Sequence, residues 1–378
     1  MVINQLDSKT IAWLRFPLAV AVVFIHNWGQ PSDIEYSQLH TLPVTGMDLY
    51  NYIRICFSHV ITHAAVPIFY LFSGYLYFVN GGGHYINRIK KKTTTLFIPY
   101  ILWNIIALIC IVMFMLGGII IKGNQFDNIL HLFEENGWCK LFWNYNQWGF
   151  DKTNWLGFMQ PVNSGPINLP LWFLRDLFIV VLLTPLIELL LKYCRQYGVY
   201  ILALCYISRC WFDIPGFSIT ALFFFTAGAY LSLNGKSLTT EFSRIKYWLY
   251  TISFILFIVM MWYDGSNTTF GNNLYSLFVL SMVVSVINIS STLIQKEKVS
   301  INKWLSNSSF FIFAFHTILI VPKTIGFICG FITTDDNPFI MIAKYFTTGI
   351  LTVILSLLVY KFMQKHMPKT LRILMGNR

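Results

Sequence analysis

Charged side chains are scarce in this sequence of 378 residues. Asp, Glu, Lys and Arg make up 11% of it, against about 25% in a typical soluble domain. Hydrophobic residues account for 56%. So few charges cannot cover the surface of a soluble globule, and the same composition excludes a disordered chain and a collagen-like one. The sequence therefore predicts an integral membrane protein.

Acidic residues are scarcer than basic ones, with 16 Asp and Glu against 27 Lys and Arg. In a soluble protein this excess would suggest nucleic acid, but here it indicates which loops face the cytoplasm. The seven cysteines indicate no disulfide framework, because only Cys139 lies clearly in an outer loop. The sequence contains no phosphate-binding glycine loop, zinc helix of the His-Glu-x-x-His type or Gly-x-Ser-x-Gly turn. We expect neither a metal nor a nucleic-acid partner.

Long apolar runs dominate the chain. A helix needs roughly 17 to 25 apolar residues to cross a hydrocarbon core. Ten runs come close to this length, at residues 11–28, 56–79, 95–121, 170–191, 198–213, 215–233, 247–263, 271–294, 308–332 and 339–362. The fifth run is short and could be re-entrant. The sequence thus predicts one all-α domain over residues 1–378, a polytopic bundle of about ten transmembrane helices.

The distribution of Lys and Arg predicts the orientation of these spans. With the N-terminus inside, most of the 27 fall in cytoplasmic segments, as basic residues in short loops favour the cytoplasm. Both termini are then cytoplasmic. The long segment 122–169 lies outside and is rich in Trp and Asn. Its aromatic rings could stack on sugars, or could anchor the segment at the membrane interface.

Ionisable residues within spans are costly and usually mark a functional site. Arg15 and His26 are eleven residues apart, which on a helix is three turns plus about 20°, with a rise of about 16.5 Å. Singly, each could form a structural ion pair or hydrogen bond between helices. As a pair on one helix face they favour function. The remaining members of this set are His59, His63, Arg175, Asp176, Arg209, His316, Lys323 and Lys344.

The interval from Arg15 to His26 resembles the hallmark of the acyltransferase-3 family, multi-spanning membrane enzymes that transfer acyl groups, usually acetyl, to carbohydrates. Further similar motifs follow in order along residues 11 to about 360. They are Ser73-Gly74-Tyr75-Leu76, then Arg88-Ile-Lys-Lys91 before Pro99-Tyr100, then Leu171-Trp172-Phe173-Leu174, and finally Phe315-His316-Thr317. Lys91 stands where the family more often has Arg.

The resemblance implies an O-acetyltransferase of the bacterial inner membrane that uses acetyl-CoA as its co-substrate. Arg15, Arg88 and Lys91 would bind the phosphates of the donor at the cytoplasmic side. His26 would then act as a general base or as a transient acyl carrier, and both routes stay open. The acceptor would be a hydroxyl of a cell-surface or lipid-linked carbohydrate. Enzymes of polysaccharide assembly could be further partners.

Four other residues have supporting or substrate roles in this interpretation. Ser73 would allow close helix approach. Trp172 and Arg175 would face the acceptor or anchor the interface. His316 would orient His26 or contact the donor, although a buried histidine bonded to a neighbouring helix fits as well.

The alternative function is a transporter or flippase for a lipid-linked saccharide. Arg15, Arg175 and Arg209 would then line an anionic path. Such proteins typically carry paired broken helices at corresponding positions of two halves, and the sequence has no such symmetry.

Overall fold

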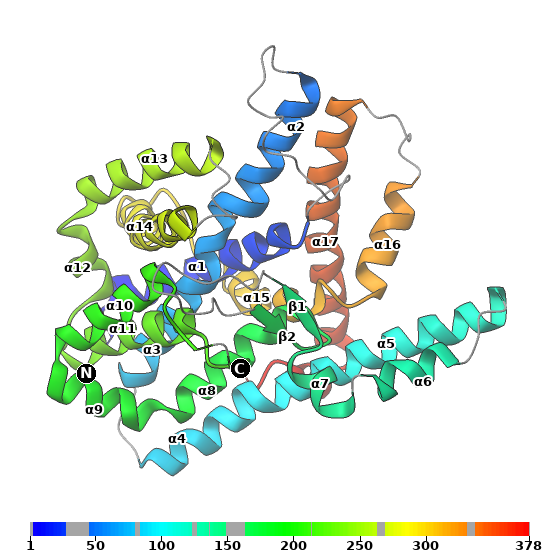
Figure 1. The fold of residues 1–378 in the computed structure, drawn as a ribbon, viewed down its shortest axis with the longest axis horizontal. Helices are drawn as coiled ribbons and strands as arrows, with labels where there is room; N and C mark the ends of the chain where they lie inside the picture. The colour runs from blue at the N-terminus through cyan, green and yellow to red at the C-terminus, as the bar shows by residue number, and fades with distance from the viewer. Residues whose placement is uncertain are drawn as a thin grey trace.

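The computed structural model describes residues 3–27, 45–79, 84–122, 127–135, 137–148, 163–212, 214–262, 269–330 and 337–377. Helices make up nearly all of them (Figure 1), which confirms the predicted all-α class. The helices are α1 (Gln5–Ile25), α2 (Gly46–Arg54), α3 (Ala65–Val79), α4 (Tyr85–Lys92), α5 (Ile98–Lys122), α6 (Asp127–Glu134), α7 (Gly137–Trp143), α8 (Trp172–Leu182), α9 (Thr184–Cys194), α10 (Gln196–Ser208), α11 (Ile219–Leu233), α12 (Leu238–Ser243), α13 (Lys246–Trp262), α14 (Thr269–Gln295), α15 (Lys303–Phe315), α16 (Ile320–Cys329), α17 (Pro338–His366) and α18 (Pro368–Leu374).

Five helical stretches in the described residues are long and apolar enough to cross a membrane, and two bent helix pairs would bring the number to seven. The five are Gln5–Ile25, Gly46–Val79, Tyr85–Ile121, Phe270–Gln295 and Pro338–His366. Three further helices, α10, α11 and α13, are apolar but shorter than these candidate spans. Helices thus occupy all ten predicted segments. They support an integral membrane protein, and the number of crossings stays a prediction.

Two of the predicted spans are broken rather than continuous. The segment 170–191 consists of α8 and α9, which differ in direction by 61°, and the segment 308–332 consists of α15 and α16, at 93°. Each break comes shortly before a proline, Pro185 or Pro322. A proline has no N–H to donate, and its ring clashes with the carbonyl four residues earlier, so it favours a kink or break in the helix shortly before it. His316 therefore lies at the end of a helix.

The basic segment around Arg88-Ile-Lys-Lys91 is helical from Tyr85 onward. Residues 80–83 lie outside the described part. The helix α4 continues through a π-helical turn, η4 (Thr93–Phe97), directly into α5. A second π-helical turn, η2 (Ile55–Val60), and a 3-10 turn, η3 (Ile61–Ala64), lead into α3. Such π turns often occur at functional sites, and both lie beside the sites described below.

The segment 122–169 contains structure that its sequence did not indicate. Two short strands, β1 (Asn146–Trp148) and β2 (Asn163–Gly165), pair antiparallel with Gln147 opposite Ser164. In Figure 1, α5 and α6 extend side by side away from the rest of the molecule. Trp138 on α7 is 64% exposed. Trp155 and Asn154 lie outside the described residues.

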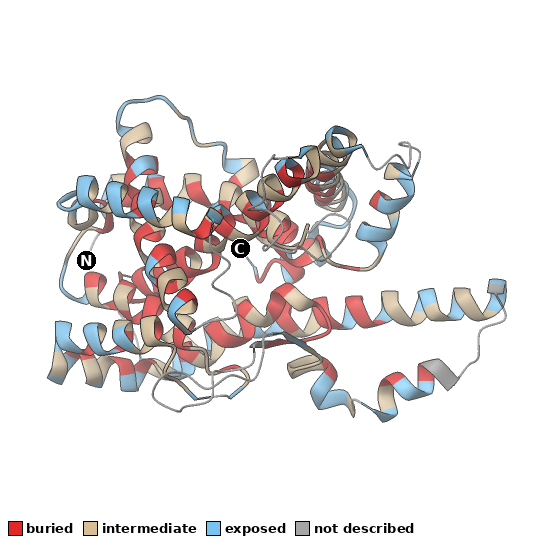
Figure 2. Cartoon of the chain, turned by 45° about the horizontal axis from the view of Figure 1, so that its top comes forward, coloured by how far each residue is buried: buried red, intermediate tan, exposed pale blue. Residues whose placement is uncertain are grey.

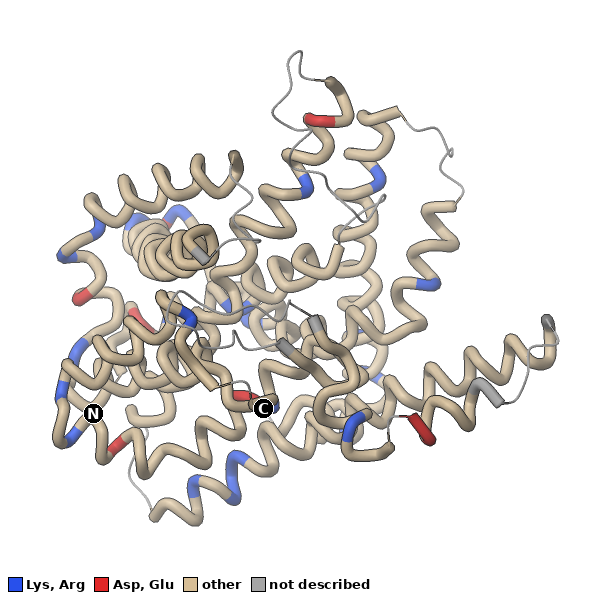
Figure 3. Tube along the Cα trace, in the orientation of Figure 1, with Lys and Arg blue, Asp and Glu red and all other residues tan. Residues whose placement is uncertain are grey.

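Several Lys and Arg residues lie along the edge formed by α4, α9 and α12 (Figure 3). The helices α4 and α12 lie in segments predicted to be cytoplasmic, and α9 ends at the start of another. The side of the membrane on which this edge lies stays a prediction.

A buried carboxylate fixes the beginning of α1. Both oxygens of Asp7 accept hydrogen bonds: the Tyr75 hydroxyl donates at 2.8 Å, the Thr239 hydroxyl at 2.7 Å and the Ser237 hydroxyl at 3.0 Å. The backbone N–H groups of Leu238 and Thr239 also donate to it, at 3.1 and 3.0 Å. These two N–H groups belong to the first residues of α12, and the N-terminus of a helix stabilises a negative charge. Asp7 therefore joins α1 to α3 and α12.

The buried residues concentrate on the inner faces of the helices (Figure 2), and α3 packs most tightly against α11. Two glycines permit this contact. A Cβ atom at Gly74 would lie 2.0 Å from the Phe225 carbonyl oxygen, and one at Gly228 would lie 2.1 Å from that of Leu71. Small residues that let helix backbones approach are common in membrane bundles. Within the Ser73-Gly74 motif, the close approach of the two helices occurs at Gly74; the role expected of Ser73 stays a prediction.

The substitution Gly74→Ala should destabilise the protein, because the new methyl group would collide with helix backbone rather than with a movable side chain. We expect a loss of about 2–3 kcal/mol, measured by thermal unfolding in detergent. The matched control is Gly117→Ala in α5, where a Cβ meets nothing within 4 Å. Equal Tm values for the two variants would contradict this account of the α3–α11 contact.

Candidate active site

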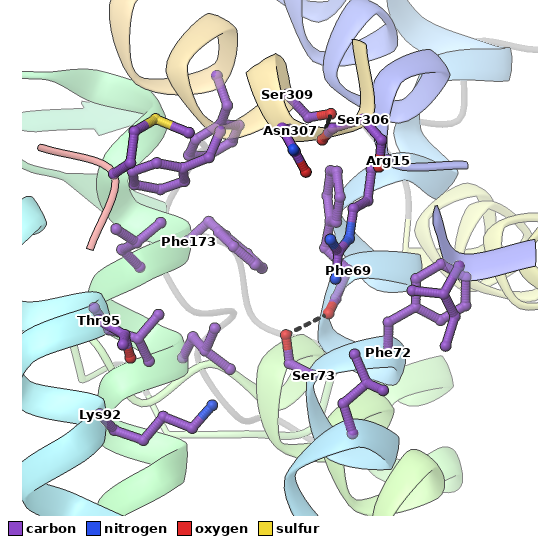
Figure 4. Close-up of a pocket in the computed structure, with 18 of the residues that line it drawn as sticks. Arg15, Phe69, Phe72, Ser73, Lys92, Thr95, Phe173, Ser306, Asn307 and Ser309 are labelled. Carbon is purple, nitrogen blue, oxygen red and sulfur yellow. Dashed lines mark hydrogen bonds between the residues drawn. The ribbon is translucent and has the colours of Figure 1, made fainter. Parts of the chain in front are cut away.

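A cavity of about 540 Å³ opens between α1, α3, η4, α8, α15 and the C-terminal helices α17 and α18. Much of its wall is aromatic, and Figure 4 shows Phe69 and Phe173 on facing sides. Polar groups line the rest, among them Asn307 and Gln364. The cavity can therefore hold a ligand that is partly apolar and partly polar.

Four cations line this cavity, and no Asp or Glu does so among the described residues. Arg15 and Lys92 enter it from opposite walls (Figure 4). Lys91 and Arg372 complete the group, to which we refer as the cation group. A cleft lined by charges of one sign concentrates ligands of the opposite charge. The cavity is suited to an anionic ligand such as a phosphate ester.

Local helix geometry places Arg15 and Ser73 at the cavity. Ile11 and Arg15 are four residues apart, on one face of α1, and both line it. On α3, the Ser73 hydroxyl lines it too but donates a hydrogen bond to the Phe69 carbonyl oxygen at 2.7 Å. Because this bond within the helix uses the hydroxyl proton, Ser73 contributes to the cavity wall and does not donate to a ligand.

The other end of α1 carries His26, next to His316. The centroids of the two rings are 5.3 Å apart. His26 is half-buried at the C-terminal cap of α1, and His316 is buried at the end of α15. The 93° break after α15 thus brings a second imidazole to the end of α1. We call these two residues the histidine pair.

Hydrogen bonds from two neighbouring segments hold the chain directly after His26. The Asn27 side chain donates to the Tyr345 carbonyl oxygen at 2.8 Å. The Ser58 hydroxyl donates to the Asn27 carbonyl oxygen at 2.9 Å and lies 2.7 Å from the Tyr345 hydroxyl. Ser58 belongs to the π turn η2 and Tyr345 to α17, so both elements position His26.

The two ring nitrogens of His316 differ: one is hydrogen-bonded to the backbone, and the other has no hydrogen-bond partner among the described residues. Its Nδ1 lies 3.1 Å from the Ile312 carbonyl oxygen, which can only accept, so Nδ1 carries the proton. Its Nε2 is buried and has no hydrogen-bond partner within the described residues. A neutral imidazole in this tautomer presents an acceptor at Nε2. Buried polar atoms of this kind call for a functional explanation.

A further histidine, His63, lies within electrostatic range of His26. Its ring stacks on His59 at 6.0 Å and meets the edge of Tyr275 at 5.6 Å. The Arg209 guanidinium lies over the same Tyr275 ring, at 5.7 Å. His63 was notable in the sequence only as an intramembrane ionisable residue. Its place near His26 could not be predicted, because the contact joins two separate helices.

Two of the three predicted donor-binding residues line the cavity, and the third does not. Arg15 and Lys91 line the cavity, whereas Arg88 does not. Arg88 instead forms an ion pair with Glu188 at 3.0 Å and lies over the Tyr77 ring at 5.1 Å. It joins α4 to α9. Sequence reasoning missed Lys92, although it follows Lys91 directly, and Arg372, which lies beyond the motifs.

Arg175 and Trp172 lie near the start of α8, where the sequence placed them, but Arg175 is occupied by the protein itself. Its guanidinium pairs with Asp176 at 2.9 Å, donates to the Ser164 carbonyl oxygen at 2.9 Å and also donates to the Trp143 carbonyl oxygen. These bonds join β2 and α7 to α8. Trp172 is half-buried, with its ring 6.5 Å from that of Tyr70.

The cavity and the histidine pair are separate but connected by two helices. Neither histidine lines the cavity. On α15, Phe313 lines it and His316 follows three residues later. On α1, Arg15 and His26 are separated by a rise of about 16.5 Å. In the parts of the chain that the structure describes, no group of three His, Cys, Asp or Glu could hold a metal ion.

Comparison with known proteins identifies the class to which this fold and cavity belong. Residues 8–361 match the family described as "Acyltransferase domain". The chain therefore belongs to the acyltransferase-3 family of integral-membrane acyltransferases, as the sequence motifs predicted.

A curated relative is the succinoglycan biosynthesis protein ExoH of Rhizobium meliloti (strain 1021), which is 26% identical over 238 residues. The match covers 61% of this chain and 55% of that protein, so the chain aligns with about half the length of this relative. No solved structure matches.

The substitution Asp176→Asn should strongly destabilise the protein, because it leaves the buried Arg175 guanidinium without its counter-charge. Breaking one partner of a buried pair costs about 3–5 kcal/mol, measurable as a lower Tm in detergent. The matched control is Glu134→Gln. Its pair with His131 is exposed, at 68% and 60%, so it should cost well under 1 kcal/mol. Comparable losses in both variants would be inconsistent with a structural role for the Arg175–Asp176 pair.

Proposed function

We propose that this protein transfers an acetyl or other short acyl group from cytoplasmic acyl-CoA to a hydroxyl group of a cell-surface or lipid-linked carbohydrate. The observation that carries the proposal is the arrangement of α1, which presents Arg15 to a cationic cavity near one end and His26 to His316 at the other. Family membership supports acyl transfer, and the relative named for succinoglycan biosynthesis supports a carbohydrate acceptor.

The donor would occupy the cavity through its two chemically different parts. Its phosphates would bind Arg15, Lys91 and Lys92 by charge-assisted hydrogen bonds. Its long arm would lie against the aromatic wall that includes Phe69 and Phe313, and would extend along α1 and α15 toward the histidine pair. Arg88 is left out of this site, because Glu188 already neutralises it.

In the direct route, the hydroxyl oxygen of the acceptor attacks the thioester carbonyl carbon while His26 accepts the hydroxyl proton. The C–S bond then breaks, and the thiolate of CoA leaves and takes up a proton. In the alternative route, a ring nitrogen of His26 attacks the thioester carbonyl carbon, the C–S bond breaks and CoA leaves as the thiol. The acceptor hydroxyl then attacks the acyl-imidazole, the C–N bond breaks, and the released imidazole takes up the hydroxyl proton. The histidine pair accommodates both routes.

His316 would act as a positioning residue. Its Nδ1–H is fixed by the Ile312 carbonyl oxygen, and its ring lies beside that of His26. The acceptor nitrogen, Nε2, is then available to the histidine pair or to a substrate hydroxyl. A fixed second group that orients a catalytic imidazole is a recurrent arrangement in acyl transfer.

The proposed setting is a bacterial inner membrane, crossed about ten times by a single domain with both termini in the cytoplasm. The cation group would then lie on the cytoplasmic side and the histidine pair toward the outer side, below the segment 122–169. This orientation would bring a cytoplasmic donor to an outer acceptor. The two broken spans are a feature found in transporters. The transporter alternative still has less support, because the family to which the chain belongs consists of acyltransferases.

Replacing His26 by Ala should lower the rate of acetyl transfer from labelled acetyl-CoA to the glycan fraction of membranes by about 10²- to 10⁴-fold, the usual contribution of a general base. His131→Ala is the control, because His131 is an exposed histidine on α6, away from the histidine pair. Transfer at the wild-type rate by the His26 variant would refute the catalytic assignment.

Replacing Lys91 or Arg15 by Ala should raise the KM for acetyl-CoA about tenfold each, with a smaller effect on kcat, because each removes a cation from the donor cavity. Lys90→Ala is a matched control, since Lys90 is the immediate neighbour but does not line the cavity. A KM that rises equally for Lys90→Ala would show that general surface charge, rather than the cavity, attracts the donor.

A further inference from the structure

The C-terminal helix α18 forms part of the cavity wall. Leu371, Arg372 and Met375 line the cavity, together with Gln364 and Pro368 just before them. The family match ends at residue 361, so this wall lies entirely outside it. Nothing in the family motifs therefore assigns a role to α18.

Several contacts hold α18 firmly at the cavity. The Trp103 indole N–H donates to the Leu374 carbonyl oxygen at 3.1 Å, and Leu371 and Leu374 are buried. The chain then turns at Gly376, which has a φ of +71°. A Cβ atom there would lie 2.5 Å from the Thr95 carbonyl oxygen, so only glycine fits this turn. The end of the chain is docked against η4, which itself lines the cavity.

Within this docked helix, Arg372 is the cation that faces the cavity. It takes part in none of the ion pairs found among the described residues. Lys369, on the same helix, is exposed but does not line the cavity. Arg372 completes the cation group from a third side, because Arg15 comes from α1 and the two lysines from α4.

We infer that α18 is a structural part of the donor site and that Arg372 binds a phosphate group of the donor. This inference rests on the proposed function, in which the cavity holds acyl-CoA. A guanidinium presents a planar set of donors that fits phosphate oxygens, and it stays charged at any physiological pH. The proposed phosphate-binding site thus includes a residue beyond residues 8–361, the part of the chain that matches the family.

The test is the affinity of the purified full-length protein for CoA and for pantetheine, which has the same arm but no phosphates, by titration calorimetry. Arg372→Ala should weaken CoA binding about tenfold, as expected for one lost charge-assisted hydrogen bond, and leave pantetheine binding unchanged. Arg372→Lys should recover part of the affinity. Lys369→Ala, which removes a charge from the same helix, should bind both ligands as the wild type does.

The outcomes separate the inference from the proposed function. If Arg372→Ala binds CoA like the wild type, or loses affinity for CoA and pantetheine equally, Arg372 does not bind phosphate and the inference is overturned alone. If the wild type binds CoA no more tightly than pantetheine, the cationic donor site itself is wrong, and the proposed function fails with it. A fold defect is detected by comparing the Tm of Arg372→Ala with that of Lys369→Ala.

Discussion

The position of α1 depends on one buried carboxylate. Asp7 accepts five hydrogen bonds from α3 and from the beginning of α12, and so fixes the start of the helix that carries both Arg15 and His26. Each oxygen of this buried carboxyl group accepts at least two of these bonds, which offset the cost of burying a polar group. The far end of α1 is held separately, through Asn27. With both ends fixed, the helix sets where the cavity and the histidine pair lie.

The polar groups of this protein divide between holding the bundle together and serving the site. Asp7 is hydrogen-bonded by the protein's own donors, and Arg88 and Arg175 are paired with carboxylates; all three connect helices. The cation group and the histidine pair, in contrast, keep charge or lone pairs directed at open or unfilled positions. Polar groups inside a membrane are costly in either case. The partners of the structural groups offset this cost, whereas the cation group lines a cavity suited to an anionic ligand.

The sequence predicted the features that the membrane itself demands. Apolar runs gave the helices, because a lipid core admits few alternatives, and the spacing of Arg15 and His26 placed both on α1. The breaks before Pro185 and Pro322 were visible in principle, but an apolar run masks them. The role of Asp7 could not be predicted, because its partners lie some 70 and 230 residues away. The ion pair of Arg88 could not be predicted for the same reason, since Glu188 lies 100 residues further on.

The length of α1 sets the separation between its two functional residues, Arg15 and His26. α1 continues through Pro17 to Ile25, so the backbone rise between Arg15 and His26 is about 16.5 Å. If phosphates are held at one end and chemistry occurs at the other, the protein accepts only donors whose arm matches that interval. The thioester of a donor with a shorter arm would not reach the imidazole. A bulkier acyl group would extend past the imidazole. Discrimination between donors would then reside in the length of a helix rather than in the shape of a pocket.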